Sequence, residues 1–311
     1  MSVRSINRLQ PPACQGRAAE ERSETIHIVV PVHNRKALTE RFLGCLDQQT
    51  FRNFTVTVVD DGSTDGTSEL IQNRFPDVSV LRGDGNLWWS GATNMGIRHV
   101  LRHASENDAV LIINDDLEVD PIYLDRLYGV WRDHPNTLIG SIVVDLDDPD
   151  RIFCGGETLS RWVAKSRWLN TGKRLSAFSS SHCVKVSLLN GAGTLIPVPV
   201  FHEIGLYDEK HFQHGGDTEL PIRASNKGYS LIVAYGAVVK IHPETTAGIN
   251  VQRNYSFRDL KTFFFGVKSY YRLKYRIFFA YNTSRNPLAF CSFLISDLTR
   301  ITFHFLSRVR L

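Results

Sequence analysis

The feature that most constrains this chain is an unbroken apolar run that ends in acidic residues. Residues 109–113 (AVLII) are followed at once by Asn114, Asp115 and Asp116. Five consecutive apolar residues predict a strand that is buried on both faces, as in a parallel sheet covered by helices. Carboxylates at the end of such a strand are costly unless a positive group pairs with them, and the adjacent sequence supplies none. The run therefore predicts either a turn that faces solvent or a site that holds a cation.

The N-terminal part of the chain alternates strands with helices. Apolar strands are expected at residues 26–31, 54–61, 78–81, 109–113 and 138–144. Asn34 is suited to cap the helix after the first strand, and Asp120 with Pro121 to begin the helix after the fourth. This order predicts a mostly parallel central sheet flanked by helices. The shorter elements that follow include a helix near 217–227 and strands at 230–235 and 237–242.

Composition limits the class of protein. The 311 residues are 42% hydrophobic and 22% charged, which suits one large α/β domain with an appendage or two ordinary domains. The five cysteines are scattered without a Cys-x-x-Cys pair, which argues against a disulfide framework or a zinc ribbon and favours a reducing compartment. Residues 1–25 are polar, so we expect a disordered N-terminal extension rather than a signal peptide. No segment reaches the roughly 18 uncharged apolar residues of a membrane-spanning helix.

Two of the expected strands end in a pair of acids, Asp60–Asp61 and Asp115–Asp116. The carboxyl ends of parallel strands meet at one edge of a sheet, where ligands bind. Four converging carboxylates repel one another unless a cation neutralises them, and Mg²⁺ or Mn²⁺ prefers such oxygen ligands and leaves positions open for phosphate oxygens. The alternative is that these aspartates only make turns and caps. The first strand is not followed by Gly-x-Gly-x-x-Gly and no Walker loop occurs, which disfavours a Rossmann-type oxidoreductase.

Seven segments occur in the order and approximate spacing of a known family. They are IVVPVHNR, VVDDGSTDGT, GNLWWSGATNMGI, LIINDD, LLNGAGTLIPVPVFHEIGLYDE, GGDTELPIRASNKGY and VVKIH. Over about residues 26–245 the chain resembles the family 2 glycosyltransferases with the GT-A fold, and most closely their rhamnosyltransferase-like branch. The resemblance implies a GT-A nucleotide-diphospho-sugar transferase fold, with a catalytic domain at residues 26–250.

The resemblance also implies roles for individual residues. The residues expected to bind the nucleotide-sugar donor are Pro31, Asn34, Asp61, Asn94 and Asp115. Asp116 and His242 are expected to bind a divalent metal, Mn²⁺ or Mg²⁺, although without the resemblance a core histidine would be the preferred interpretation of His242. Asp217 matches the catalytic base, and Glu219 matches a second acid of that motif, which we place at the acceptor. The residue before Asp217 is usually Glu in the family and is Gly216 here.

Three further residues are candidates for the acceptor side. Trp88 and Trp89 are adjacent, and they either pack in the core or form an aromatic wall for a donor or acceptor sugar. Gly193 lies in the segment Asn-Gly-Ala-Gly. This segment is either a simple turn or a place where an acceptor approaches the backbone closely.

Residues 251–311 differ in charge from the rest of the chain. They carry eleven Lys or Arg against two acids, a net charge of +9, whereas the first 250 residues carry 25 against 30, a net charge of −5. They also hold 15 of the 33 aromatic residues. We favour a helical tail that lies on an anionic membrane surface. The alternatives are a helical pair packed on the catalytic domain and a nucleic-acid-binding segment, which is disfavoured because no such module is recognisable.

Together these features predict an inverting, metal-dependent glycosyltransferase of surface polysaccharide biosynthesis. It would use a UDP- or dTDP-linked sugar and a saccharide or lipid-linked acceptor, and would lie in the cytoplasm on the inner face of the plasma membrane. A carboxylate would take the proton of the acceptor hydroxyl, and a metal would stabilise the departing diphosphate. The alternatives are a non-catalytic nucleotide-sugar-binding scaffold of the same fold and a metal-dependent nucleotidyltransferase, whose usual glycine-rich basic first loop the segment PVHNRKA lacks.

Overall fold

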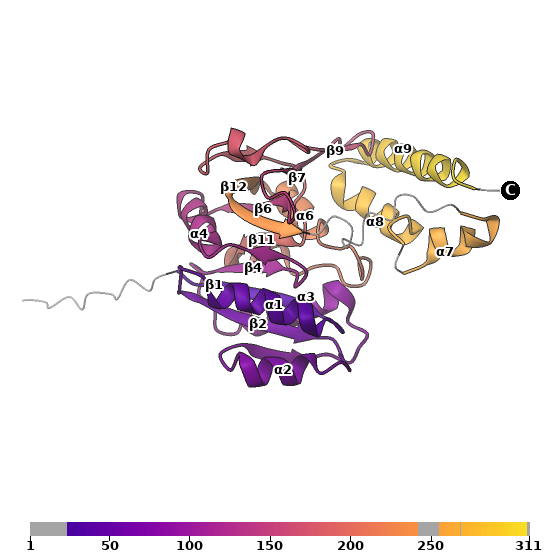
Figure 1. Cartoon of the computed structure of the whole chain (residues 1–311). Helices are drawn as coiled ribbons and strands as arrows, with labels where there is room; N and C mark the ends of the chain where they lie inside the picture. The colour runs from indigo at the N-terminus through magenta and orange to yellow at the C-terminus, as the bar shows by residue number, and fades with distance from the viewer. Residues whose placement is uncertain (1–23, 242–254, 268, 310–311) are drawn as a thin grey trace, which may run out of the picture.

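The computed structural model describes residues 24–241, 255–267 and 269–309. At their centre is a ten-stranded sheet with the strand order β10-β12-β6-β11-β4-β1-β2-β3, to which β5 adds beside β12 and β7 beside β6. Helices flank this sheet, and the C-terminal helices α7 to α9 lie together at one side of the molecule (Figure 1). The expected α/β architecture with a helical C-terminal segment is confirmed.

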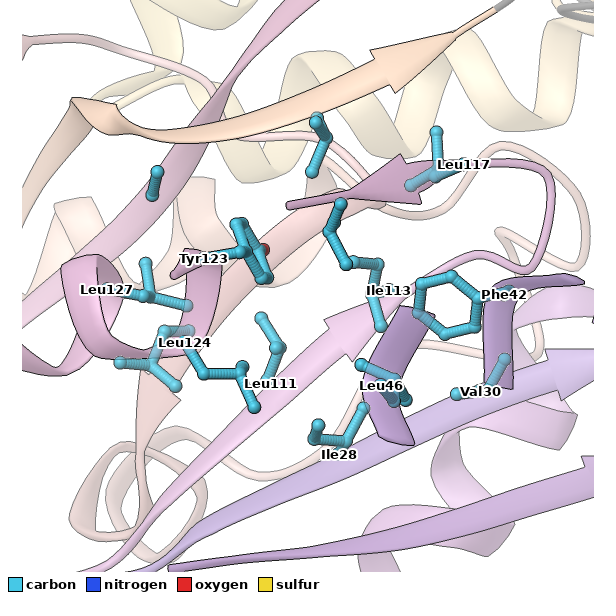
Figure 2. Packing of buried hydrophobic residues seen from close by; sticks show 14 of the residues in the cluster. Ile28, Val30, Phe42, Leu46, Leu111, Ile113, Leu117, Tyr123, Leu124 and Leu127 are labelled. Carbon is cyan, nitrogen blue, oxygen red and sulfur yellow. The ribbon is translucent and has the colours of Figure 1, made fainter. Parts of the chain in front are cut away.

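The N-terminal half of the sheet is wholly parallel. Its strands are β1 (Ile26–Val32), β2 (Phe54–Asp60), β3 (Ser79–Arg82) and β4 (Ala109–Ile113). The helices between them are α1 (Lys36–Asp47), α2 (Thr67–Arg74) and α3 (Trp88–Val100). α1 packs Phe42 and Leu46 into one buried cluster (Figure 2), and α3 packs Ile97 and Val100 into another with alternate strand residues. Both faces of the strands are thus covered, as the unbroken apolar runs predict.

The C-terminal half of the sheet is mixed. Its strands are β5 (Glu118–Val119), β6 (Thr137–Asp145), β7 (Ile152–Cys154), β10 (Cys183–Lys185), β11 (Ala192–Pro197) and β12 (Ser230–Ile241). The helical elements are α4 (Tyr123–Asp133), η1 (Leu175–Ala177), α5 (Val198–Ile204) and α6 (Glu219–Lys227), and β8 (Glu157–Leu159) pairs with β9 (Ser166–Trp168) in a separate hairpin. β11 runs antiparallel between β4 and β6. The two strands expected at 230–235 and 237–242 are one strand with a register shift after Ala234.

Two helix starts differ from the expectation. Asn34 has a φ of 52° and does not cap α1, which begins at Lys36. α4 begins at Tyr123, because Asp120 and Pro121 form a turn whose carbonyl oxygens accept hydrogen bonds from the side chains of Gln49 and Thr50. In both places a polar loop continues further than the sequence pattern predicts.

The C-terminal residues 255–309, called the helical tail below, pack on the sheet domain. The tail comprises η2 (Phe257–Asp259), α7 (Leu260–Phe265), α8 (Leu273–Thr283) and α9 (Pro287–Leu306). A buried cluster joins Phe212 and Ile222 of the sheet domain to Phe279 on α8 and Phe293 on α9. This is the arrangement of one alternative, a helical group packed on the catalytic domain.

α9 is apolar although it carries a buried ion pair. Asp297 is fully buried and pairs with Arg276 on α8 at 3.5 Å and with Arg300 on its own helix at 2.5 Å. Within the described part of the chain, α9 is the one helix long and apolar enough to cross a membrane, judged by length and composition only. The expectation of no uncharged run of that length is met, since Asp297 and Arg300 interrupt α9.

Candidate active site

The loops after β1 and β4 meet at the carboxyl edge of the parallel strands. Arg35 donates from Nη1 to Oδ1 of Asp115 at 3.1 Å and to Oδ2 of Asp116 at 3.0 Å. Thr39 on α1 donates to the other oxygen of Asp115 at 2.9 Å. The positive partner that the adjacent sequence lacks is therefore Arg35, which comes 80 residues before Asp115.

The charges of this group depend on one another. The side chain of Asp115 is 1% exposed, and that of Asp116 is 26% exposed. Burial raises the pKa of Asp115, and the neighbouring Arg35 and Thr39 counteract part of that rise. Burial alone would lower the pKa of Arg35, but the two carboxylates raise it overall. The end of β4 is thus a place that holds a positive charge.

The other acid pair points elsewhere, so the expected convergence of four carboxylates on one cation is wrong. Asp60 accepts from the N–H of Ser63 at 2.8 Å and from the hydroxyl of Ser68 in α2. Asp61 accepts from three backbone N–H groups, those of Gly85 at 2.9 Å, Leu87 at 3.2 Å and Trp88 at 3.0 Å. These donors satisfy both carboxylates without a metal. Asp61 thereby holds the loop that leads into α3.

Asp217 reaches the β4 edge through a short turn. The N–H of Gly191 donates to Oδ2 of Asp217 at 2.9 Å, and the carbonyl of Gly191 accepts from the N–H of Asn114 at 3.2 Å. Trp89 donates from Nε1 to Oδ1 of Asn114 at 2.9 Å. Burial raises the pKa of Asp217, and the Gly191 N–H counteracts part of the rise. A carboxylate with a raised pKa is a better proton acceptor at neutral pH than an ordinary aspartate.

The loop that carries Asp217 is held from two sides. A Cβ at Gly216 would lie 2.5 Å from Oγ of Ser90 on α3 and 2.6 Å from the carbonyl oxygen of Phe212, so no larger side chain fits there. From the other side, the hydroxyl of Tyr275 in the helical tail donates to the carbonyl of Gly215 at 3.1 Å. The unusual glycine before the expected base therefore reflects a close approach of this loop to α3.

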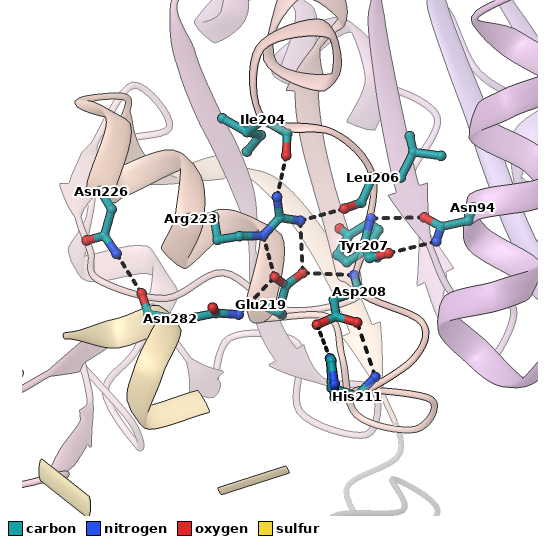
Figure 3. A network of polar contacts seen from close by, with 10 residues as sticks. All are labelled: Asn94, Ile204, Leu206, Tyr207, Asp208, His211, Glu219, Arg223, Asn226 and Asn282. Atoms are coloured by element: carbon teal, nitrogen blue, oxygen red, sulfur yellow. Dashed lines mark hydrogen bonds and ion pairs between the residues drawn. The ribbon is translucent and has the colours of Figure 1, made fainter. Parts of the chain in front are cut away.

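Asn94 and Glu219 are both buried and hydrogen-bonded within the protein. Asn94 is 1% exposed; its Nδ2 donates to the carbonyl of Tyr207 at 2.8 Å, and its Oδ1 accepts from the N–H of Tyr207 at 3.0 Å. Glu219 is also 1% exposed and accepts from Arg223, from Asn282 at 3.1 Å and from the N–H of Asp208 at 3.2 Å (Figure 3). Their polar groups hold the segment after α5, and their contacts with donor or acceptor stay predictions.

Gly193 is held in a close-packed position. Its φ is +87°, and a Cβ there would lie 2.4 Å from the hydroxyl of Tyr123 and 2.7 Å from Oγ of Ser141. That hydroxyl pair is buried, with 2.8 Å between the two oxygens. Core packing is by itself sufficient to require glycine at this position, and the contact with an acceptor stays a prediction.

The requirement for glycine at position 193 can be tested by measuring stability. Gly193→Ala should lower the free energy of unfolding by about 1–3 kcal/mol, because it combines strain at positive φ with overpacking. Gly129→Ala is the matched control, since a Cβ at Gly129 in α4 meets nothing within 4 Å. Chemical denaturation of both variants measures the difference. Equal stabilities would show that the space around Gly193 can adjust.

The remaining predicted residues lie at the same end of the sheet or outside the described residues. Pro31 lies near the end of β1, and the carboxamide of Asn34 accepts from the N–H of Thr64 at 2.8 Å. Trp88 opens α3 with a φ of 57°. Their contacts with donor or acceptor stay predictions. His242 lies outside the described residues, directly after β12.

The acid pair fits a divalent cation whose remaining ligands come from elsewhere. The described residues hold no group of three or more His, Cys, Asp or Glu side chains that could bind a metal by itself. Asp115 and Asp116 nevertheless present two carboxylate oxygens to one positive group. Mg²⁺ and Mn²⁺ are commonly bound by one or two carboxylates and complete their shell with water and substrate phosphates.

Sequence reasoning missed Arg35, Gly191 and the contribution of the helical tail. A signal for Arg35 exists, because β1 and β4 are both apolar strands of the parallel half and the loops after them share one edge. Gly191 offers no signal, since its role is a backbone N–H. The tail ring of Tyr270 packs on Gly215, and this contact joins segments that no local pattern relates.

Comparisons with known proteins identify the family of the chain. A family model described as Glycosyl transferase family 2 matches residues 27–182, half of the chain. An N-acetylglucosaminyl-diphospho-decaprenol L-rhamnosyltransferase of Mycobacterium tuberculosis is 24% identical over 262 residues, which cover 78% of this chain and 84% of that protein.

Two solved structures share the fold at low sequence identity. One is GalNAc-T7 with UDP, GalNAc and Mn²⁺, with a TM-score of 0.56 and 15% identity over 71% of this chain and 44% of that one. The other is a mannosyltransferase of Pyrobaculum calidifontis with GDP-Man and Mn²⁺, with a TM-score of 0.51 and 16% identity over 89% of this chain and 75% of that one. The chain belongs to the family 2 glycosyltransferases, is similar to their rhamnosyltransferase-like members and has the GT-A fold.

Proposed function

We propose that this glycosyltransferase is inverting and metal-dependent, and that it transfers a sugar from a UDP- or dTDP-linked donor to a saccharide or lipid-linked acceptor of surface polysaccharide biosynthesis. The observation that supports it best is the short connection from Asp217 through Gly191 and Asn114 to the acid pair. It brings a candidate base and a candidate cation site to one edge. The name of the mycobacterial relative supports a polyprenyl-diphosphate-linked acceptor.

The residues of the chain suggest how transfer would proceed. Asp217 would accept the proton of the acceptor hydroxyl as that oxygen attacks the anomeric carbon from the side opposite the diphosphate. The bond to the diphosphate breaks in the same step, so the anomeric configuration inverts and no covalent nucleophile is needed. Asp116 and His242 would hold the divalent metal, and Asp115 would lie beside them at the donor. The metal would neutralise charge on the departing diphosphate. Asp61 and Pro31 would contact the nucleobase of the donor.

A thermal-shift screen tests the donor assignment directly. We expect UDP or dTDP, or one of their sugars, to raise the melting temperature in the presence of Mn²⁺ or Mg²⁺ and much less in the presence of a chelator, because a ligand of the folded state stabilises it by mass action. ADP and GDP serve as controls. A shift of equal size with the chelator would contradict metal-dependent donor binding.

We also propose that residues 251–311 form a unit distinct from the catalytic domain at 26–250 and place the enzyme on the inner face of the plasma membrane. Large apolar side chains of α9 point away from the protein, with exposed fractions of 70% for Leu288, 66% for Ile295 and 71% for Phe303. Phe265 of α7 is 62% exposed. Apolar side chains beside a basic sequence are typical of segments that lie on anionic lipid.

Vesicle sedimentation of the full chain tests the membrane proposal. We expect the protein to sediment with vesicles containing phosphatidylglycerol, to be partly released by high salt and to remain soluble with neutral phosphatidylcholine, since salt screens the attraction between exposed charges. Ile295→Ser together with Phe303→Ser should weaken sedimentation, and Thr299→Ser on α9 is the control. Equal recovery in the supernatant with and without anionic vesicles would refute the proposal.

A further inference from the structure

Arg35 occupies the two oxygens that a cation shared by the acid pair would need. One nitrogen, Nη1, lies 3.1 Å from Oδ1 of Asp115 and 3.0 Å from Oδ2 of Asp116. A divalent ion held by the acid pair would need these oxygens and would compete with this nitrogen for them. The guanidinium and the ion therefore exclude each other at this position.

The backbone of Arg35 is anchored, whereas its side chain is partly exposed. Its carbonyl accepts from the N–H of Thr39 at 2.9 Å, which anchors it at the start of α1. Its side chain is 42% exposed, in contrast to the buried Asp115. A movement of the guanidinium toward solvent would therefore not require any change in α1, because the backbone bond to Thr39 is independent of the side chain.

We propose that Arg35 is a place-holder for the divalent cation: it neutralises Asp115 and Asp116 while the site is free of metal, and it moves to the donor diphosphate when the cation binds. This inference rests on the proposed metal dependence. It explains how a buried carboxylate has a hydrogen-bonding partner before the donor arrives. A guanidinium released beside a diphosphate has suitable geometry for paired hydrogen bonds to phosphate oxygens. Arg35 would then bind the donor without being a ligand of the metal.

For one variant of Arg35, the proposal predicts a higher affinity for Mn²⁺ and a lower affinity for the nucleotide. Arg35→Met keeps an unbranched, flexible side chain and removes its charge, so it should bind Mn²⁺ at least about tenfold more tightly than the wild type in the absence of nucleotide, because a competing charged group is gone. The same variant should bind UDP or dTDP more weakly than the wild type at saturating Mn²⁺. Arg35→Lys keeps the positive charge but cannot form paired hydrogen bonds, so both of its affinities should lie between those of the wild type and Arg35→Met.

The measurement is the electron paramagnetic resonance signal of free Mn²⁺, titrated first with the protein alone and then with nucleotide. Arg41→Met is the matched control, because Arg41 lies on α1, which follows Arg35 directly, and pairs with Glu118 at 3.0 Å instead of with the acid pair. It should leave both affinities unchanged. A thermal-shift measurement with Mn²⁺ alone checks that each variant is folded and should show a larger increase for Arg35→Met than for the wild type.

The failures of the two proposals can be told apart. If the wild type and Arg35→Met bind Mn²⁺ with the same affinity in the absence of nucleotide, Arg35 is not a place-holder, although metal dependence stands. If Arg35→Met binds nucleotide as tightly as the wild type at saturating Mn²⁺, its transfer to the diphosphate is refuted. If no variant binds Mn²⁺ even with nucleotide present, both the place-holder and the metal dependence are refuted.

Discussion

Asp116→Ala should abolish Mn²⁺-dependent binding of the nucleoside diphosphate and leave the fold intact. Asp116 is the more exposed member of the acid pair, and its loss removes one of two carboxylates available to the cation at this edge. Since Mg²⁺ and Mn²⁺ depend on few protein ligands at such sites, the loss of one should cost most of the affinity. The fold should persist because Asp115 keeps both Arg35 and Thr39 as partners.

Isothermal titration with UDP and dTDP in the presence of Mn²⁺ measures this effect. Glu106→Ala is the control, because Glu106 precedes the same strand at its other end and forms an exposed pair with His202 at 2.9 Å. It should bind donor as the wild type does. If Asp116→Ala also binds the nucleotide normally, the acid pair does not hold the metal and the function of Arg35 has to be sought elsewhere.

The position of the site could be predicted from the sequence because strand ends carry it. The run 109–113 is β4 with the expected bounds, and the acids after it lie at the carboxyl edge. The same logic fails for Asp60 and Asp61, whose carboxylates are taken up by backbone N–H groups and a serine hydroxyl. A sequence shows where an acid lies along a strand, but not which donors the loop turns toward it.

The family motifs likewise did not reveal that two of the candidate residues are buried. Asn94 and Glu219 lie within segments that resemble the family, yet both are buried and hold the loop around Tyr207 and Asp208. A polar residue that is needed for folding and one that is needed for binding look the same in a motif. The difference is visible only when every hydrogen-bonding group of the side chain has a partner within the protein.

The helical tail was the least predictable part. Its composition indicates a basic and aromatic helical segment, and the helices are present. Composition does not reveal that Tyr275 and Asn282 bind the loop of the expected base and the helix after it. These contacts link segments about 60 residues apart, so they depend on the tertiary fold.

Asp217→Asn should lower the rate of sugar transfer by at least ~10²-fold, the usual scale for the loss of a general base, while donor affinity stays nearly unchanged. Asparagine keeps the size of the side chain and an oxygen that can accept from the Gly191 N–H, but it cannot take a proton. Transfer should be measured at saturating donor, with nucleotide affinity measured separately. This separates a lost base from a displaced donor.

Glu219→Gln is the matched variant, because Glu219 lies two residues from Asp217 and is the other acid of the motif. Since its carboxylate pairs with Arg223 and accepts from Asn282 and Asp208, its change should lower the melting temperature. Transfer per folded molecule should remain within a few-fold of the wild type. If Glu219→Gln abolishes transfer and Asp217→Asn does not, the base is misassigned and the loop must rearrange on binding. If neither change slows transfer, proton removal by a carboxylate of this loop is not part of the reaction, and the inverting mechanism loses its support.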